Sequence, residues 1–196
     1  MVCNGDERVL SELDAIQKEK PGQDEITNQS LAWVRSISEG ALRRIGIKSS
    51  DKMKAELMIH SQILGIATQI DGLVQHEDGT LTMIDWKSGS HFLSDQTTAN
   101  IMQYSVGTIE NMPDSKINKA KLELVIRAMM VKEHVPEAIF RNIFVQHLDR
   151  NNPFKAPHEV HVADYLRIIS NYLMSENPSA YEAAKKEGLL DPNNYQ

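Results

Sequence analysis

The chain has 196 residues, of which 41% are apolar and 24% charged, a balance typical of one folded domain rather than of a disordered chain. No apolar run reaches the roughly 18–20 residues that a membrane helix needs, and the sequence does not open on an apolar segment, so we expect neither a membrane span nor a secretion signal. A single cysteine, Cys3, excludes an internal disulfide and any four-cysteine zinc or iron–sulfur site. The net charge of −6 argues against a broad basic surface for nucleic acid but leaves room for a local one.

Residues 1–27 read as an N-terminal extension, and a helix is predicted over Asn28–Ile45. Apolar residues fall at helical spacing in that stretch, and Gly46 stands where a capping glycine belongs. After Gly46 the apolar period changes to two, which predicts strands. Three strands joined by short turns are therefore expected: Ala55–Ile63, Ile66–Gln75 and Thr80–Lys87.

The next segment is predicted to hold one helix and two strands. The helix is expected over Thr98–Asn111. Strong alternation of apolar residues then predicts a strand over Lys121–Val131 and another over Ala138–Leu148. The loop Glu133–Glu137 is expected to join these two strands as a hairpin.

The C-terminal part, residues 151–196, is expected to be a helical segment that packs on a core domain formed by residues 28–150. Amphipathic spacing predicts a helix from Val162 to about Ser175, and Asn177 opens a second, shorter helix. The element order predicts an α/β (α+β) fold with a central mixed sheet of about five strands and flanking helices.

Charged residues interrupt the strand region where apolar residues would continue the pattern. Asp85 and Lys87 end an apolar strand, and because side chains two apart on a strand share one face, roughly 7 Å apart, they point the same way. Asp71 stands near the end of the preceding strand, and Glu56 lies one strand earlier. Carboxylate oxygens are the ligands that Mg²⁺ or Mn²⁺ prefers, and a neighbouring lysine suits charge that develops on a phosphate.

A plainer interpretation of the same residues stays open at this point. Asp71 belongs to a turn with Gly72 in that interpretation, and Asp85 and Lys87 form a surface ion pair at a strand end. Against it, burying an unpaired carboxylate beside an apolar strand is costly, and a metal ion is a natural partner. Trp86, between the two charged residues, points to the opposite face and is expected in the core.

The string GIATQIDGLV, a hairpin, and then GTLTMIDWKSGS resembles the PD-(D/E)XK nuclease superfamily, in particular its RecB-like and phage-exonuclease branch. The resemblance covers residues 56–89 and weakens by residue 104. It implies a restriction-endonuclease-like core that hydrolyses phosphodiester bonds with Mg²⁺ or Mn²⁺. It also places Glu56, Asp71, Asp85 and Lys87 at the metal and catalytic positions.

The resemblance implies three further site residues. Gln103 is expected to orient the site, Tyr104 to contact the substrate, and Glu39, on the first helix, to serve as an additional metal ligand. The sequence also departs from the pattern of the superfamily. Thr68 stands where a glycine is usual, and Gly107 replaces a tyrosine, which favours a protein that keeps the fold without the turnover.

A run of basic residues precedes the strands of the candidate site. Either it is a solvated helix end, or it tracks phosphates of a nucleic acid. The candidate substrate-binding residues in this run are Arg43, Arg44, Lys48 and Lys54.

The function expected from the sequence is a metal-dependent DNA nuclease, in exonuclease rather than endonuclease mode, that acts in recombination, repair or phage DNA processing. DNA, single- or double-stranded, is the expected partner, together with a recombination or replication protein, in the cytoplasm, or in the bacterial host cytoplasm if the protein is phage-encoded. Two alternatives stay open: a non-catalytic DNA-binding or assembly module, and an RNA endonuclease on the same core.

Overall fold

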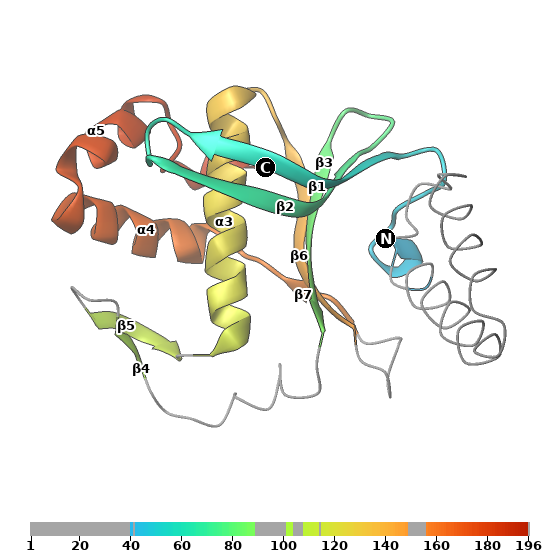
Figure 1. The fold of residues 1–196 in the computed structure, drawn as a ribbon, viewed down its shortest axis with the longest axis horizontal. Coiled ribbons are helices and arrows are strands. Elements are labelled where there is room, and N and C mark those ends of the chain that lie inside the picture. The colour runs from blue at the N-terminus through green and yellow to red at the C-terminus, as the bar shows by residue number, and fades with distance from the viewer. Residues whose placement is uncertain are drawn as a thin grey trace, which may run out of the picture.

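The computed structural model describes residues 40, 42–88, 101–103, 108–113, 115–148 and 156–195. In these residues a five-stranded mixed sheet, in the order β1-β2-β3-β6-β7, is flanked by helices, as the sequence predicted (Figure 1). Its strands are β1 (Lys52–Ser61), β2 (Ile66–Gln75), β3 (Leu81–Ser88), β6 (Phe140–Leu148) and β7 (His158–Glu159). None of the described helices has both the length and the apolar character that a membrane crossing requires.

The first three strands form the antiparallel meander that the period of two predicted. β1 pairs with β2, and β2 pairs with β3. Gly65 and Gly79, in the two turns, both have positive φ, a conformation that favours glycine. In the second turn Asp78 accepts hydrogen bonds from the backbone and the hydroxyl of Thr80 and pairs with Arg141, and these contacts lower the pKa of Asp78 to about 2.

The helix α3 (Lys116–His134) replaces the strand that was predicted over Lys121–Val131. Its residues are buried almost all round, so the apolar pattern fits a period of two as well as a helical one. Ser115 caps the helix by accepting a hydrogen bond from Asn118 N, 3.2 Å away. The prediction failed because burial on every side of a helix removes its polar stripe.

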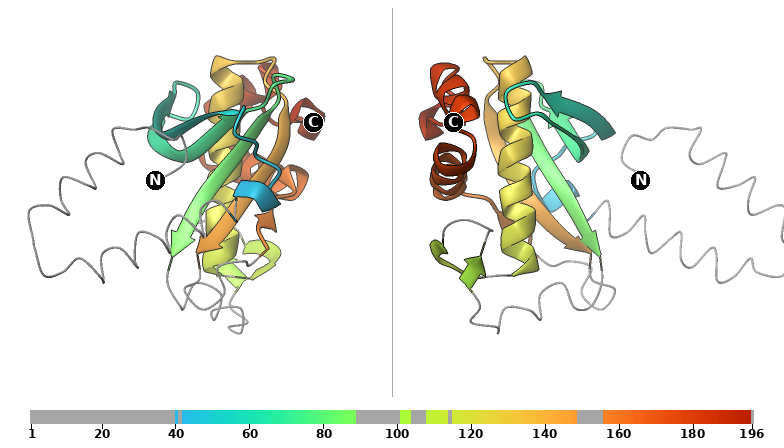
Figure 2. Two further views of the ribbon diagram at one scale, coloured as in Figure 1. Left: turned by 90° about the vertical axis from the view of Figure 1, so that its right-hand side faces the viewer. Right: turned by 60° about the vertical axis from the view of Figure 1, so that its left-hand side comes forward.

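The segment Glu133–Glu137, which begins in the last turn of α3, therefore joins a helix to a strand, and the predicted hairpin there is wrong. The strand that follows, β6, pairs in parallel with β3, with Asp85 beside Val145 and Lys87 beside His147. α3 is thus the crossover between two parallel neighbours, the connection that parallel strands require. In the left view of Figure 2 the helical turn at residues 42–44 lies in front of the strands and α3 lies behind them.

The predicted helix over Thr98–Asn111 is wrong where the chain is described. Two strands, β4 (Ile101–Gln103) and β5 (Thr108–Pro113), pair there as a separate antiparallel sheet. The first predicted helix lies mostly outside the described residues. Its end is present as a helical turn at residues 42–44, and Gly46, with φ of 75°, follows as the predicted cap.

The two predicted C-terminal helices are confirmed as α4 (Val162–Glu176) and α5 (Pro178–Lys186), which lie beyond α3 in Figure 1. Asn177 caps α5 by accepting a hydrogen bond from Ala180 N. The segment after α5 is not the simple polar tail that its composition suggested. It ends in the short helix η2 (Pro192–Tyr195), where Tyr195 is buried and its hydroxyl donates to Leu189 O at 2.7 Å.

Each face of the sheet carries its own apolar core. The helix-side core lies between the sheet and helices α3 and α4, and includes Met83, Val145 and Met129. The outer core on the opposite face is smaller and consists of Ile45, Met53, Val74, Ile84 and Phe144, with Leu42, Ile47 and Trp86 packed against them. Trp86 thus lies in a core, as its position between Asp85 and Lys87 predicted.

A latch of hydrogen bonds ties the tip of the β1–β2 hairpin to the end of α3. The Glu133 carboxylate accepts hydrogen bonds from the backbone N–H groups of Gln62 and Ile63, at 2.8 and 3.3 Å, and from the Ser61 hydroxyl. The hairpin passes over α3 in Figure 1, so this latch closes the helix-side core at its upper end. We call Ser61, Gln62, Ile63 and Glu133 the hairpin latch.

Candidate active site

β3 presents Asp85 and Lys87 on the face that packs against α3, as the two-residue spacing predicted. Met83, two residues earlier, is part of the helix-side core, so the whole row faces the same way. Asp85 is fully buried, whereas the Lys87 side chain is 29% exposed. Lys87 Nζ lies 2.8 Å from Asp85 Oδ2. The pair therefore reaches from the buried centre of the sheet toward the surface.

Arg127 of α3 is the residue at this site that sequence reasoning missed. Its Nη1 donates to Asp85 Oδ1 at 2.7 Å, and its side chain is 13% exposed. The strand predicted over Lys121–Val131 would have put Arg127 within a sheet. As a helix, this segment instead packs on the face of the sheet that carries Asp85. The available signal was the arginine itself, the one charge inside the apolar run LVIRAMMV.

The carboxylate of Asp85 keeps one acceptor that no hydrogen bond satisfies. Oδ2 is buried and makes an ion pair with Lys87, but that contact lacks the directionality of a hydrogen bond. The ammonium of Lys87, 2.8 Å away, therefore supplies the positive charge that this buried oxygen faces.

Asp71 lies across from Asp85 at the point where β2 and β3 separate. The last backbone pair of the two strands is Gly72 with Ile84, and one step further the register places Asp71 opposite Asp85. Here the Asp71 side chain takes the place of a backbone acceptor between the two strands, because its Oδ2 accepts the hydrogen bond of Trp86 N at 3.0 Å. The structure thus brings the two predicted carboxylates together.

Burial is the largest influence on Asp71 and raises the pKa of its carboxyl. The negative charge of Asp85 raises this pKa further, while the Trp86 N–H and the charges of Arg127 and Lys87 lower it. Burial thus outweighs the opposing effects of the Trp86 N–H and the two cations on the pKa of Asp71.

Glu56 is not gathered into this group. It lies on β1 across from Asp71, its side chain is exposed, and its φ is +54°. Met53 belongs to the outer core but Leu57 packs against the helix-side core, so the facing of β1 inverts around Glu56. In the described part of the chain no three histidine, cysteine or acidic side chains form a group that could hold a metal ion.

The described structure does not test the other three predicted site residues. Gln103 lies on the short strand β4 instead of the predicted helix. Tyr104 and Glu39 lie outside the described residues. The roles assigned to these three residues remain predictions.

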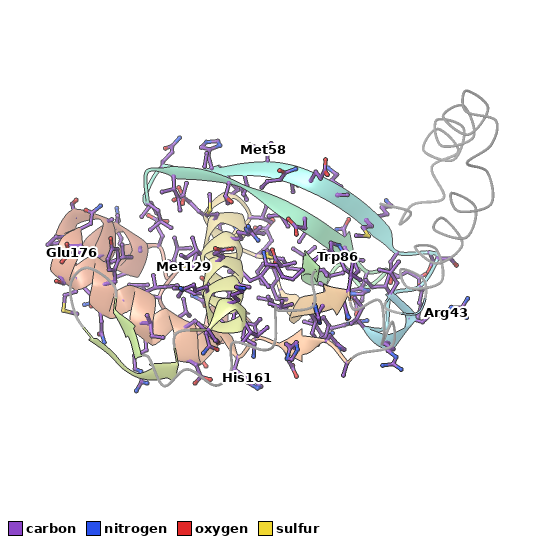
Figure 3. The ribbon with its side chains drawn as sticks, turned by 60° about the horizontal axis from the view of Figure 1, so that its bottom comes forward. Arg43, Met58, Trp86, Met129, His161 and Glu176 are labelled. Atoms are coloured by element: carbon purple, nitrogen blue, oxygen red, sulfur yellow. The ribbon has the colours of Figure 1, made fainter. Side chains whose placement is uncertain are left out.

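The basic run lies on the other side of the sheet from Asp85. Ile45, between Arg44 and Lys48, belongs to the outer core, whereas Arg127 approaches Asp85 from the helix side. Figure 3 shows Arg43 and Met129 of α3 on opposite sides of Trp86. The other basic candidates of the run are exposed at the helix end or on β1: Arg44, Lys48 and Lys54. The structure does not bring this run together with Lys87.

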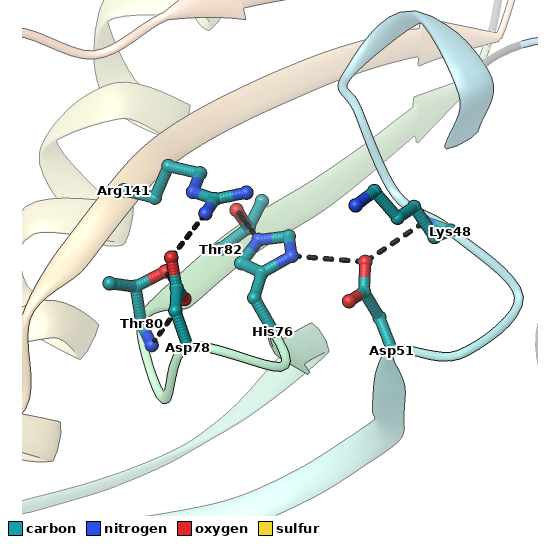
Figure 4. Close-up of polar contacts among 7 residues, drawn as sticks. All are labelled: Lys48, Asp51, His76, Asp78, Thr80, Thr82 and Arg141. Atoms are coloured by element: carbon teal, nitrogen blue, oxygen red, sulfur yellow. Dashed lines mark hydrogen bonds and ion pairs between the residues drawn. The ribbon is translucent and has the colours of Figure 1, made fainter.

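A second polar network has residue types that are common in catalysis, but its burial makes it structural. His76 Nδ1 lies 3.0 Å from Asp51 Oδ2, and His76 Nε2 lies 2.7 Å from Thr82 Oγ1 (Figure 4). The Lys48 N–H, at 2.9 Å, and His76 hold the pKa of Asp51 below its usual value. Thr82 is 0% exposed, so its hydroxyl cannot meet a substrate. The network ties the loop before β1 to the start of β3.

Asp71, Asp85, Lys87 and Arg127 therefore form the candidate active site. Two carboxylates and two cations meet where β2 and β3 diverge, with each Asp85 oxygen facing one of the cations. The oxygen ligands suit Mg²⁺ or Mn²⁺, and the cations suit a phosphate. Comparisons with models of protein families, with curated proteins and with solved structures find no match to this chain.

Proposed function

We propose that this protein is a divalent-metal-dependent nuclease that hydrolyses phosphodiester bonds in DNA. The observation that carries the proposal is the meeting of Asp71, Asp85 and Lys87 at one point of the sheet, with Asp85 Oδ2 buried and lacking a hydrogen bond. Two adjacent carboxylates, one of them with a raised pKa, are stabilised by a divalent cation.

In this proposal each residue has its own task. Asp71 and Asp85 would hold Mg²⁺ or Mn²⁺, which when bound polarises a phosphoryl oxygen and acidifies water. Lys87 is the more exposed of the charged pair and would stabilise negative charge that develops on the phosphate, or orient the attacking water. Burial of Asp85 excludes water around its carboxylate and strengthens these electrostatic interactions.

The order of elements supports a restriction-endonuclease-like core. From residue 42 to residue 148, a helix end, three antiparallel strands, a crossover helix and a parallel strand occur in this order, with the small β4–β5 sheet between β3 and the helix. Apart from that small sheet, this is the order that the resemblance to PD-(D/E)XK nucleases implies. The choice of DNA, the exonuclease mode and the setting in recombination, repair or phage DNA processing are supported by that sequence resemblance alone.

Arg127 favours a second candidate, a module that binds DNA or assembles with a partner without turnover. Together with Lys87 it places two cations against Asp85, and Glu56 does not complete a third carboxylate. A site that is neutral overall attracts a divalent ion less than the acidic one expected from the sequence. An RNA endonuclease remains the third candidate, because the same metal chemistry acts on either sugar.

One experiment separates these candidates. End-labelled single- and double-stranded DNA and RNA are incubated with the protein in Mg²⁺, Mn²⁺ or EDTA, and the products are resolved by length. A DNA nuclease cleaves DNA with metal and not in EDTA, and an exonuclease releases nucleotides from one end. Binding without cleavage in every metal would favour the non-catalytic module, and cleavage of RNA alone would favour the third candidate.

The matched controls are conservative substitutions at exposed positions. Asp164→Asn, in the first turn of α4, parallels Asp85→Asn, and Lys186→Ala, at the end of α5, parallels Lys87→Ala. If the Asp85→Asn variant cleaves DNA in one preparation but not in a second, a contaminating nuclease is the source of that cleavage.

A further inference from the structure

Asp85 is neutralised by the protein's own cations. Arg127 Nη1 donates to Oδ1 at 2.7 Å, and Lys87 Nζ lies 2.8 Å from Oδ2. Each oxygen of this buried carboxylate therefore already faces a positive charge. A divalent ion that used Asp85 would have to share the carboxylate with a guanidinium or displace it.

Among the described residues, the other carboxylates that Arg127 meets are Asp71, whose pKa its charge lowers, and Glu123. Its Nη2 lies 3.9 Å from Oε2 of Glu123, an exposed residue one helical turn earlier, which makes a weak ion pair. A guanidinium has five N–H donors in a planar fork that matches phosphate as well as carboxylate. Because its side chain is partly exposed, Arg127 can turn from the buried Asp85 toward an anion at the surface.

We propose that Arg127 exchanges partners and thereby couples metal binding to phosphodiester binding. It neutralises Asp85 when no ion is bound, and it moves to a substrate phosphate when a divalent ion takes over the carboxylate. This inference rests on the proposed nuclease function. Because coupling between two sites is reciprocal, DNA should tighten metal binding by the same factor by which metal tightens DNA binding.

The exchange predicts two effects for a variant that removes the guanidinium. Arg127→Gln deletes the positive charge that competes for Asp85, so Mn²⁺ should bind this variant more tightly than the wild type when no DNA is present. The same variant lacks the guanidinium that would bind a substrate phosphate, so DNA should no longer tighten Mn²⁺ binding. An arginine that only neutralises Asp85 would produce the first effect but not the second, so the loss of DNA-induced tightening is the decisive readout.

Free Mn²⁺ is measured by electron paramagnetic resonance during titration of the full chain, with and without a short single-stranded phosphorothioate oligodeoxynucleotide that resists cleavage. For the wild type, DNA should tighten Mn²⁺ binding about 5-fold or more, the lower range of measured couplings. Arg127→Gln should bind Mn²⁺ about 5-fold or more tightly without DNA and gain nothing when DNA is added. Arg141→Gln, which removes an arginine from the exposed pair with Asp78, should behave like the wild type.

Arg127→Lys keeps the test decisive if Arg127→Gln does not fold. Lysine retains the charge against Asp85 but lacks the planar fork, so Mn²⁺ affinity should stay near the wild-type value while the DNA-induced tightening falls. Wild-type affinity and full coupling in both variants would overturn the inference while leaving the proposed function intact, provided Asp85→Asn abolishes Mn²⁺ binding. If no variant and no wild-type sample binds Mn²⁺, the proposed function falls and the inference falls with it.

Discussion

Arg127 and Asp85 lie 42 residues apart in the sequence, and the guanidinium of one donates to the buried carboxylate of the other at 2.7 Å. This contact joins the crossover helix to the central strand at the candidate site. Removing the charge of Asp85 would leave Arg127 without its buried partner and should destabilise the protein. Burial instead disfavours the charge of Asp71, so removing that charge should stabilise the protein.

Asp85→Asn should lower the stability of the metal-free protein and abolish cleavage. The amide keeps the volume but withdraws the charge from Arg127 and Lys87, at a cost on the order of 1–3 kcal/mol. The effect is measured by urea unfolding in EDTA, with Asp164→Asn as the control. A variant as stable as the wild type would show that the contact with Arg127 contributes nothing net.

Asp71→Asn should instead raise the melting temperature of the metal-free protein at neutral pH. Folding raises the pKa of Asp71 above its ordinary value of 3.8, chiefly by burial, so ionisation of this group destabilises the fold. An amide oxygen can still accept the hydrogen bond of Trp86 N. The advantage of the variant should be complete above the raised pKa and shrink as the pH falls toward 3.8. Melting curves across pH in EDTA check this, and an advantage that grows on acidification would contradict it.

Lys87→Ala should reduce turnover far more than substrate binding. Lys87 is proposed to act on charge that develops during the reaction, so the ground state needs it less. The loss of turnover should be about 10²-fold or more, as for the removal of one electrostatic stabiliser. Cleavage rates are compared with binding of a phosphorothioate oligonucleotide, and Lys186→Ala serves as the control. Equal losses in both would reduce Lys87 to a phosphate anchor.

Mn²⁺ should raise the melting temperature through the two aspartates. A ligand that binds only the folded state adds RT ln(1 + [L]/Kd), about 2.7 kcal/mol at a hundredfold excess over Kd. In a domain of this size that corresponds to roughly 5–10 °C. The rise should vanish in the double variant Asp71→Asn/Asp85→Asn. A melting curve that millimolar Mn²⁺ leaves unchanged would favour the non-catalytic module.

Thr82→Val should destabilise the protein more than Thr80→Val. The Thr82 hydroxyl is the partner of His76 Nε2 inside the protein, so its loss leaves a buried ring nitrogen unsatisfied, at a cost of about 1–3 kcal/mol. The Thr80 hydroxyl donates to the exposed Asp78, which water can solvate instead. Urea unfolding of the two variants gives the comparison, and equal costs would show that water reaches His76.

The three strands of the meander and β6 could be predicted because the pattern that marks each of them is local, whereas β4, β5 and β7 were not predicted as strands. The meander from β1 to β3 has a period of two and glycine in its turns, and both signals are local. The alternation of side chains along a strand, which is also local, predicted that Asp85 and Lys87 share one face. α3 was missed because a helix that is buried on nearly every side shows no polar stripe.

Only the part of the candidate site that lies on neighbouring strands could be predicted. Asp71 and Asp85 are brought together by a hairpin, whose register follows from the turn. Arg127 arrives through a crossover helix, and nothing in the spacing of LELVIRAMMV indicates which strand residue it meets. The inversion of β1 occurs at Glu56, whose φ is +54°, a conformation that a glutamate in a strand sequence does not signal.

The hairpin latch decides where a reporter peptide or an affinity tag can be placed inside this chain. Tips of β-hairpins are ordinarily good insertion points, because their backbone is solvated and makes few contacts. The tip at residues 62–64 is different, because Glu133 binds two of its backbone N–H groups and the hydroxyl of Ser61. A peptide inserted there would separate the hairpin from α3, the helix that carries Arg127. The break between α4 and α5, where exposed residues surround Glu176, is the better place to interrupt the chain.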